Sequence, residues 1–357
     1  MFGLSNKGKP EAVSMKSAAT LMPEAWRAEV EDHVLDLRWS PDGTMLAALP
    51  SLGSIVIYQH DGGVLARLPA HAGGNGAIAW HPKKPLLATY GHDSTVRFHA
   101  TPFRDAPTEF VLEKGWADRI AWNQDGTLLA ATVGKKLFIL NADSGAVLQT
   151  MPDHKSTICD IAWNPCMKNQ ITSVCDGGAR MWRVGEAKPF AHFDWGGASL
   201  IVTWSPDGRW VVTGDQTPSV HLYDVKRRHP LHIQGYETKM KTMAWQSDSA
   251  WLATGGGKSI TVWPCTGKKG PEGSKPIQLF GHLGDAVCMD FAPKQPLLVS
   301  GGRDGLLLLW MPHRADSPAL ISQRNNEITA VRWGPDNAAF AFGTETGEVF
   351  LLKVSLR

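Results

Sequence analysis

The chain has 357 residues, of which 43% are hydrophobic and 20% are charged, a composition typical of a globular protein. Its 36 Lys and Arg residues nearly balance its 34 Asp and Glu residues. This balance argues against recruitment by nucleic acid or by an anionic membrane, because the whole molecule projects no strong field.

The first 23 residues show no pattern of a structural element, and we expect them to form a flexible tail. The stretch up to residue 25 lacks the apolar core of a secretory signal, and no window of the chain approaches about 18 uninterrupted apolar residues. The five Cys residues are odd in number and form no C-x-x-C pair, which favours a reducing compartment over a disulfide framework. We therefore expect a cytoplasmic protein without a membrane partner.

A short pattern recurs along the rest of the chain: an alternating strand that ends in an aromatic residue, a turn, and then an apolar strand rich in small residues. The aromatic anchors of its eight copies are Trp39, Trp80, Trp122, Trp163, Trp204, Trp245, Phe291 and Trp333. They lie 41 or 42 residues apart except for one interval of 46, which matches the period of a four-stranded propeller blade. The long interval contains CTGKKGPEGSKP at 265–276, which we expect to form an extended loop.

The turns and strands within each copy fit the same architecture. Pro and Gly in Ser-Pro-Asp-Gly at 40–43 and at 205–208 suit a tight turn. Each copy continues with a second, a third and a weaker fourth strand, but the last copy ends after its third strand. Because an extra strand precedes the first copy, we predict that residues 24–33 complete the last blade. The predicted fold is all-β, a closed eight-bladed β-propeller of four-stranded antiparallel blades; seven blades plus an irregular extra repeat is the alternative.

Residues 24–357 resemble the WD-repeat β-propeller family, which implies a single propeller domain over this range. In that family a His, a Ser or Thr, an Asp and a Trp form a buried hydrogen-bonded set within a blade. Two copies match this pattern, with His154, Thr172, Asp176 and Trp182 in one and His282, Ser300, Asp304 and Trp310 in the other. A third copy keeps His71, Thr89 and Asp93 but has His99 at the Trp position. Elsewhere Trp195 and Tyr236 fill the His position.

Three patterns that could carry chemistry have a structural explanation. A His and an Asp beside a hydroxyl are found in nucleophilic sites, but buried polar groups in a core need the same partners. Gly-Gly-Gly-Lys-Ser at 255–259 resembles the end of a phosphate-binding loop, yet it joins two predicted antiparallel strands rather than a strand and a helix. Cys159, Cys166 and Cys175 near His154 could bind zinc, but their spacing matches no standard zinc pattern and we do not expect them to converge.

The loops that lead into the inner strands and the turns between second and third strands emerge on one rim of the predicted propeller. Aromatic and Arg residues are common interface anchors, so this rim is the candidate binding surface. Its candidate residues are Trp116, Trp195, Asp215, Tyr236, Lys239, Lys241, Arg303, Arg324 and Glu345. The basic run at 226–229 is interpreted as a solvated turn rather than a nucleic-acid site.

The sequence favours a non-enzymatic scaffold that is monomeric alone, binds protein partners of unknown identity and needs no cofactor or metal. This step rests on what the resemblance implies. Two alternatives remain open. A small-ligand-binding or enzymatic propeller would use the central channel, where the sequence offers only scattered candidates: Asp36, Asp118, Arg119, Asp160 and Asp290. A metal-handling protein would use the thiols of the fourth copy.

Overall fold

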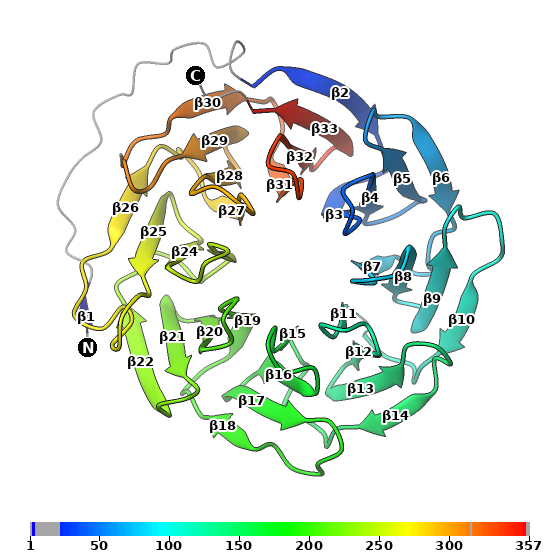
Figure 1. Ribbon diagram of the computed structural model, residues 1–357, viewed down its shortest axis with the longest axis horizontal. Helices are drawn as coiled ribbons and strands as arrows, with labels where there is room; N and C mark the ends of the chain where they lie inside the picture. Colours follow the sequence, from blue (N-terminus) through cyan, green and yellow to red (C-terminus); the bar gives the residue numbers. More distant parts are fainter. Residues whose placement is uncertain (1, 4–21, 117, 315, 355–357) are drawn as a thin grey trace.

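The strands of the protein form eight sheets arranged in a ring around a central opening (Figure 1). This computed structural model describes residues 2–3, 22–116, 118–314 and 316–354. The predicted eight-bladed propeller is confirmed, and the alternative of seven blades is wrong. Most of the expected tail, residues 1–23, lies outside the described residues. Within the described ranges, no helix is long and apolar enough to cross a membrane.

The first four blades follow one another along the chain. Blade 1 contains β3 (Val34–Trp39), β4 (Met45–Pro50), β5 (Ile55–Gln59) and β6 (Val64–Leu68). Blade 2 contains β7 (Asn75–Trp80), β8 (Leu86–Gly91), β9 (Thr95–Ala100) and β10 (Thr108–Val111). Blade 3 contains β11 (Ile120–Trp122), β12 (Leu128–Val133), β13 (Lys136–Asn141) and β14 (Val147–Thr150). Blade 4 contains β15 (Asp160–Trp163), β16 (Gln170–Cys175), β17 (Gly178–Arg183) and β18 (Ala191–Phe193).

The remaining blades keep the same order, with the first strand of each nearest the opening. Blade 5 contains β19 (Ser199–Trp204), β20 (Trp210–Asp215), β21 (Ser219–Asp224) and β22 (His229–Gln234), and β1 (Phe2–Gly3) pairs with β22 in parallel. Blade 6 contains β23 (Thr242–Trp245), β24 (Trp251–Gly255), β25 (Ser259–Pro264) and β26 (Ile277–Phe280). Blade 7 contains β27 (Ala286–Phe291), β28 (Leu298–Gly302), β29 (Leu306–Trp310) and β30 (Leu320–Gln323). Blade 8 contains β31 (Ile328–Trp333), β32 (Ala339–Thr344), β33 (Glu348–Lys353) and β2 (Glu24–Glu29).

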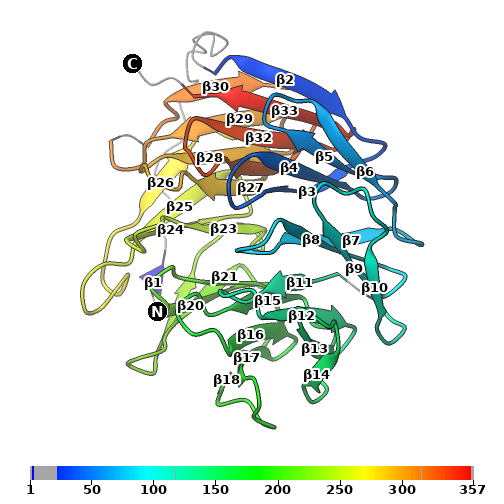
Figure 2. The same ribbon diagram turned by 45° about the vertical axis from the view of Figure 1, so that its right-hand side comes forward.

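Blade 8 closes the ring by combining strands from both parts of the chain. Strand β2 runs antiparallel to β33, with Glu29 opposite Glu348, and lies along its outer edge (Figures 1 and 2). Arg27 also forms an ion pair with Glu348 at 2.7 Å. The prediction that residues 24–33 supply the outer strand of the last blade is confirmed, with the strand itself spanning 24–29.

The second strand of each blade forms the core between neighbouring sheets. Every residue of β16, β20 and β32 is buried, whereas inner strands such as β7 alternate between buried and partly exposed positions. A strand covered by a sheet on each side needs apolar residues on both faces, which explains its continuous run of small and branched side chains.

The aromatic anchors join each inner strand to the blade before it. In five blades the anchor indole donates a hydrogen bond to the carbonyl of the residue that precedes the anchor of the previous blade. The pairs are Trp39 to Arg332, Trp80 to Arg38, Trp122 to Ala79, Trp163 to Ala121 and Trp204 to Ala162, at 2.8 to 3.3 Å. The indole nitrogens of Trp245 and Trp333 are buried without a hydrogen-bond partner in the described part of the chain. The interpretation of these Trp residues as core between blades is confirmed.

This difference between anchors predicts unequal effects of the same substitution. Trp163→Phe removes the indole N–H that donates to the carbonyl of Ala121, and we expect a loss of about 1 kcal/mol in unfolding free energy. Trp333→Phe removes a similarly buried indole that has no acceptor, so it serves as the control for the lost ring volume. The denaturation midpoint of Trp163→Phe should be lower than that of Trp333→Phe. Equal midpoints would show that the inter-blade hydrogen bond contributes nothing to stability.

Candidate functional site

Two blades contain a complete series of hydrogen-bonded polar side chains that ends at a carboxylate. In blade 7, Trp310 Nε1 donates to Ser300 Oγ at 2.8 Å, and His282 Nε2 lies 2.8 Å from the same hydroxyl. The other ring nitrogen of His282 is 3.2 Å from Asp304. A carboxylate only accepts hydrogen bonds, so His282 Nδ1 donates to Asp304, while its Nε2 contacts the hydroxyl of Ser300. The four residues therefore form one continuous hydrogen-bonded set.

Blade 2 builds the same set with a second His in place of Trp. The Nδ1 of His71 is 2.9 Å from Asp93, and its Nε2 is 2.9 Å from the hydroxyl of Thr89. The oxygen of Thr89 also lies 3.2 Å from Nε2 of His99, which stands where blade 7 has Trp. A ring nitrogen at this position thus completes the set in both blades.

In blade 4 the hydroxyl differs from the one that the sequence indicated. Ser173 Oγ, rather than Thr172, lies 2.7 Å from His154 Nε2 and accepts a hydrogen bond from Trp182 at 2.8 Å. The hairpin between β16 and β17 is one residue shorter than that of blade 7, so counting back from Trp182 selects the wrong neighbour. Thr172 Oγ1 is buried without a hydrogen-bond partner among the described residues.

Asp176 does not join this set either. It pairs with Lys155 at 2.8 Å, and its side chain is 42% exposed. Its place is taken by the carbonyl of Lys135 in blade 3, which lies 3.0 Å from His154 Nδ1. The short hairpin of blade 4 therefore changes both the hydroxyl and the acceptor of the set.

The His position of blade 6 is filled by Tyr236, which performs the same bridging. Trp263 Nε1 donates to the Tyr236 hydroxyl at 2.9 Å, and that hydroxyl lies 2.8 Å from Thr254 Oγ1. Trp195, at the corresponding position of blade 5, instead stacks on His221 with a centroid distance of 3.7 Å. Both side chains are partly buried and make contacts within their blades.

Burial controls the protonation of these sets. It lowers the pKa of His71 and lowers the pKa values of His99 and His154 to about 4, because an apolar environment disfavours the imidazolium. Burial opposes ionisation of Asp304, but hydrogen bonds from His282 and from backbone N–H groups lower its pKa to about 2. The imidazoles of His71 and His154 each bridge a hydroxyl and an acceptor, so they satisfy polar groups that are buried inside their blades.

Of the candidate rim residues, Trp116 is the most exposed aromatic. Its side chain is 60% exposed, stacks on His92 with a centroid distance of 4.6 Å and donates a hydrogen bond from Nε1 to Asp118. His92 Nε2 also lies 3.5 Å from Asp118. The indole is thus held in one orientation while most of its surface faces solvent. The sequence pattern missed His92, although its place in an exposed turn beside Asp93 was a usable signal.

Lys239, Arg303 and Glu345 are also exposed, as expected for a rim. Arg303 is 3.3 Å from Glu327, whose backbone N–H is bonded to the carboxylate of Glu345 at 3.1 Å. These residues lie in blades 7 and 8 apart from Lys239, which precedes β23 of blade 6.

Two candidate rim residues take part in packing, and the selection of Asp215 as a rim anchor was wrong because it is buried. Asp215 is 2% exposed and accepts hydrogen bonds from four side chains. The donors are Ser199, Thr213, Ser219 and His221. Arg324 lies with its guanidinium carbon 4.6 Å from the ring centroid of Phe350 and 5.2 Å from that of Phe342. Its charge therefore covers aromatic rings of blade 8.

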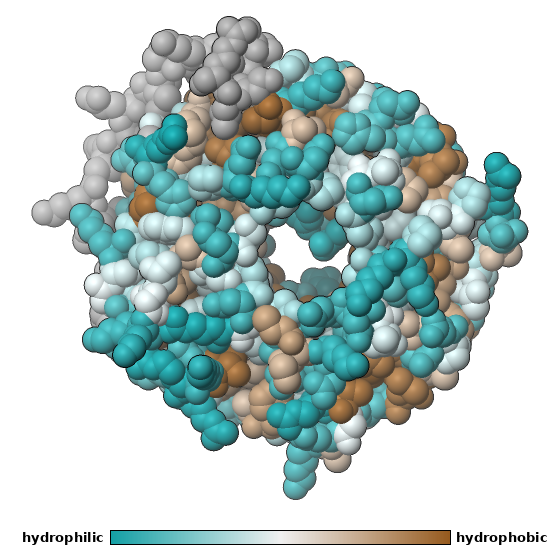
Figure 3. Space-filling view, in the orientation of Figure 1, coloured by the Kyte–Doolittle hydropathy of each residue, from teal (hydrophilic) through white to brown (hydrophobic). Residues whose placement is uncertain are grey.

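The central channel is open along the axis of the ring (Figure 3). One part of it is a cavity of about 830 Å³ lined mainly by blades 1 to 4, and another part, of about 700 Å³, is lined mainly by blades 4 to 8. Both parts include Arg38, Asp160, Lys241 and Arg332 in their walls. The channel is therefore more strongly charged than the scattered sequence candidates suggested.

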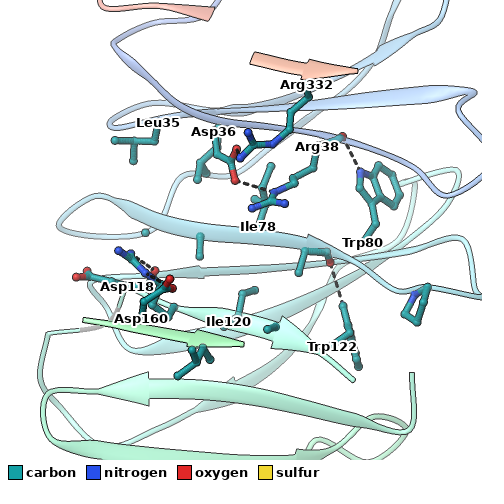
Figure 4. Close-up of a pocket in the computed structure, with 18 of the residues that line it drawn as sticks. Leu35, Asp36, Arg38, Ile78, Trp80, Asp118, Ile120, Trp122, Asp160 and Arg332 are labelled. Carbon is teal, nitrogen blue, oxygen red and sulfur yellow. Dashed lines mark hydrogen bonds and ion pairs between the residues drawn. The ribbon is translucent and has the colours of Figure 1, made fainter. Parts of the chain in front are cut away.

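The charged residues of the channel pair with one another across blade boundaries. Asp36 of blade 1 contacts Arg332 of blade 8 at 2.8 Å and Arg38 at 2.7 Å (Figure 4). Burial opposes ionisation of Asp36, but the two guanidinium charges lower its pKa. Arg119 of blade 3 pairs with Asp160 of blade 4 at 3.2 Å. These carboxylates connect adjacent blades, and each forms an ion pair with an Arg side chain.

Two of these carboxylates also accept hydrogen bonds from the backbone of the next blade. Asp160 accepts from the N–H of Val202 at 3.0 Å, and Asp290 accepts from the N–H of Trp333 at 2.8 Å. Burial raises the pKa of both carboxyl groups. Lys241, a candidate rim residue, faces the channel and pairs with Asp285 of blade 7. The channel charges are thus used mainly for cohesion between blades.

The thiols of blade 4 do not converge. Cys159 precedes β15 and its N–H bonds to the carbonyl of Val174 beside Cys175, whereas Cys166 follows the opposite end of β15. Among the described residues, no group of three or more His, Cys, Asp or Glu side chains has a geometry that could hold a metal ion. Gly-Gly-Gly-Lys-Ser at 255–259 joins antiparallel strands β24 and β25, as expected.

Comparison with known proteins identifies the repeat. The model of the WD domain, G-beta repeat, matches residues 145–183, 198–224, 228–264 and 274–311. Three of these matches begin at or just before the fourth strand of one blade and end with the third strand of the next blade. The sequence repeat is therefore shifted by one strand from the blade, and the same shift places β2 in blade 8. The chain is a WD-repeat β-propeller protein.

Several WD-repeat proteins are similar to this chain. THO complex subunit 3 of Arabidopsis thaliana is 26% identical over 220 residues, covering 58% of this chain and 67% of that protein. Actin-interacting protein 1 of Drosophila melanogaster is 26% identical over 172 residues, covering 46% of this chain and 28% of that protein. The serine-threonine kinase receptor-associated protein of Dictyostelium discoideum is 18% identical over 275 residues, covering 65% and 92%.

A solved structure has the same fold. The crystal structure of the computationally designed Ika8 protein aligns with a TM-score of 0.78 at 15% identity, covering 91% of this chain and 98% of that chain. At this identity the similarity concerns the fold alone. The WD-repeat match and the shared propeller place this protein among a family whose members typically act as interaction scaffolds and are generally not enzymes.

The polar set of blade 2 predicts a specific loss of stability in acid. The pKa of His99 falls from 6.5 to about 4 on folding, so the unfolded chain binds its proton first as the pH drops. The contribution of neutral His99 to the free energy of unfolding is fully present above about pH 6.5 and is lost as the pH falls towards 4. Between pH 7 and pH 5 the loss is about 2 kcal/mol.

The substitution His99→Gln keeps a donor for Thr89 and removes the titrating ring. We expect the loss of unfolding free energy between pH 7 and pH 5 to be smaller in this variant than in the wild type, measured by denaturant titration at both pH values. The same loss in both proteins would contradict the assignment of acid sensitivity to His99.

Proposed function

We propose that this WD-repeat propeller is a non-enzymatic scaffold that binds a protein partner through a surface centred on Trp116. The observation that carries the proposal is a large indole held rigidly by His92 and Asp118 while 60% of it remains exposed. An ordered aromatic side chain loses little conformational freedom on binding, which is why such residues are frequent interface anchors.

The surface around Trp116 is continuous across three blades. We call Leu52, His92 and Trp116, together with the backbone at Gly73, the Trp116 patch. His92 Nδ1 lies 3.0 Å from the carbonyl of Gly73, and the neighbouring Asn75 donates to the carbonyl of Gly53 at 2.9 Å. The turn that carries Leu52 in blade 1 is thereby joined to blades 2 and 3. Leu52 is 57% exposed, so apolar surface lies at both ends of the patch.

The names of the relatives support a protein partner. One relative is described as a complex subunit and another as an actin-interacting protein, although this chain spans only 28% of the latter. The charges of the channel are matched within its walls, which weakens the enzymatic alternative. The proposal takes the propeller as a monomer in the cytoplasm, and five cysteines that form no disulfide support a reducing compartment.

The patch can be tested with a matched pair of substitutions. A partner captured from native lysate and identified by mass spectrometry should bind Trp116→Ala at least tenfold more weakly than wild type, since loss of an interface anchor costs about 2 kcal/mol. Leu148→Ala, at a side chain 55% exposed on the outer strand β14, should retain wild-type affinity. A partner that binds both variants with equal affinity would place the interface elsewhere.

A further inference from the structure

The insertion that lengthens one repeat is firmly anchored against blade 5. The guanidinium of Arg209 donates to the carbonyls of Gly267 and Lys268, both at 2.6 Å, and lies 4.7 Å above the ring centroid of Trp210. Gly270 packs so closely on Trp210 that a Cβ there would lie 2.2 Å from the ring. The loop at 265–276 is therefore held in place by hydrogen bonds and by close packing.

The anchored loop lies beside the basic turn between β21 and β22. Arg227 Nη1 donates to the carbonyl of Lys268 at 2.6 Å, which joins two segments that are about one repeat apart in sequence. The fully buried carboxylate of Asp224 holds this turn in place. It accepts a hydrogen bond from the N–H of Arg227 at 2.9 Å and pairs with Arg209 at 3.0 Å. We call the five exposed cations brought together here the basic corner: Lys226, Arg227, Arg228, Lys268 and Lys269.

The cations of the basic corner lack carboxylate partners among the described residues, in contrast to other cations of this protein. Lys84 pairs with Asp143 and Lys136 with Glu113, both at 2.7 Å. Asp224 of the turn pairs with Arg209, and Glu272 of the loop lies 3.9 Å from His229. Arg227 joins the two turns through the carbonyl of Lys268, but like charges held close together repel, so the fold gives no reason to place Lys226, Arg228 and Lys269 beside it.

We infer that the basic corner is a second binding site, which recognises an acidic segment of a protein partner. Hydrophilic side chains gather on the lower left of the molecule in Figure 3, where Figure 1 shows β21 and β22. Lys and Arg side chains presented on two rigid turns offer several charge-assisted hydrogen bonds to carboxylates of an extended chain. This site is separate from the Trp116 patch and does not depend on the function proposed for it.

The composition of the corner argues against other anionic ligands. No large hydrophobic side chain within 205–231 or 265–276 is exposed, so these described ranges offer neither an aromatic surface for unpaired bases nor an apolar wedge for a membrane. A nucleic-acid duplex is held by charges distributed along its length, whereas these cations occupy one corner of a chain whose net charge is only +2.

The test uses fluorescein-labelled decaglutamate and fluorescence anisotropy at about 50 mM salt, where such contacts are weakly screened. The double substitution Lys226→Glu with Arg228→Glu should weaken binding at least tenfold. Arg67→Glu with Lys188→Glu changes the net charge equally at exposed positions of other blades and should weaken binding less than threefold. Trp116→Ala should leave binding unchanged, which separates this site from the Trp116 patch.

Two further measurements complete the design. The melting temperature of the Lys226→Glu and Arg228→Glu protein should equal or exceed that of wild type, because the substitution relieves repulsion. A short RNA duplex and phosphatidylserine vesicles should bind more weakly than decaglutamate at the same salt concentration. Equal losses in the two double variants, or tighter binding of the duplex or the vesicles, would overturn the inference.

Discussion

The ring depends on a contact repeated between neighbouring blades, the hydrogen bond from an anchor indole to a carbonyl of the preceding inner strand. Trp39 makes this contact with Arg332, so the series crosses the boundary between the first and last repeats of the chain. A blade can satisfy its indole only when its neighbour is in place. The same boundary is fixed on the outside by β2 against β33. Inner and outer contacts therefore impose the same closed arrangement.

This requirement explains why residues that look chemically active are structural here. The carboxylates Asp160 and Asp290 bind backbone N–H groups of the following blade. The imidazoles of His71 and His282 connect turns to strands within one blade. Each such group would be costly to bury alone. Side chains that the ring does not use are the informative ones, and Trp116 is exposed although it is large and apolar.

The sequence was sufficient to predict the eight-bladed architecture, because three signals follow from the same repeat. They are the spacing of the blades, the aromatic anchors and the extra strand before the first copy. It was insufficient where a side chain depends on a neighbouring blade or on the length of one turn. A one-residue difference in a hairpin exchanged Thr172 for Ser173, and the direction of Arg324 follows from Phe350 in the next blade. The basic corner joins segments separated by about 40 residues, and only the adjacency of blades 5 and 6 brings them together.

The two proposed surfaces lie on different sides of the ring, with the Trp116 patch on blades 1 to 3 and the basic corner on blades 5 and 6 (Figure 1). Coupling between two sites requires a structural element with two arrangements, and each ligand must bind one arrangement more tightly than the other. Every intervening blade is tied to its neighbours by buried contacts, and the described residues reveal no such element. A propeller of this kind can hold two partners at a fixed distance without one altering the affinity of the other.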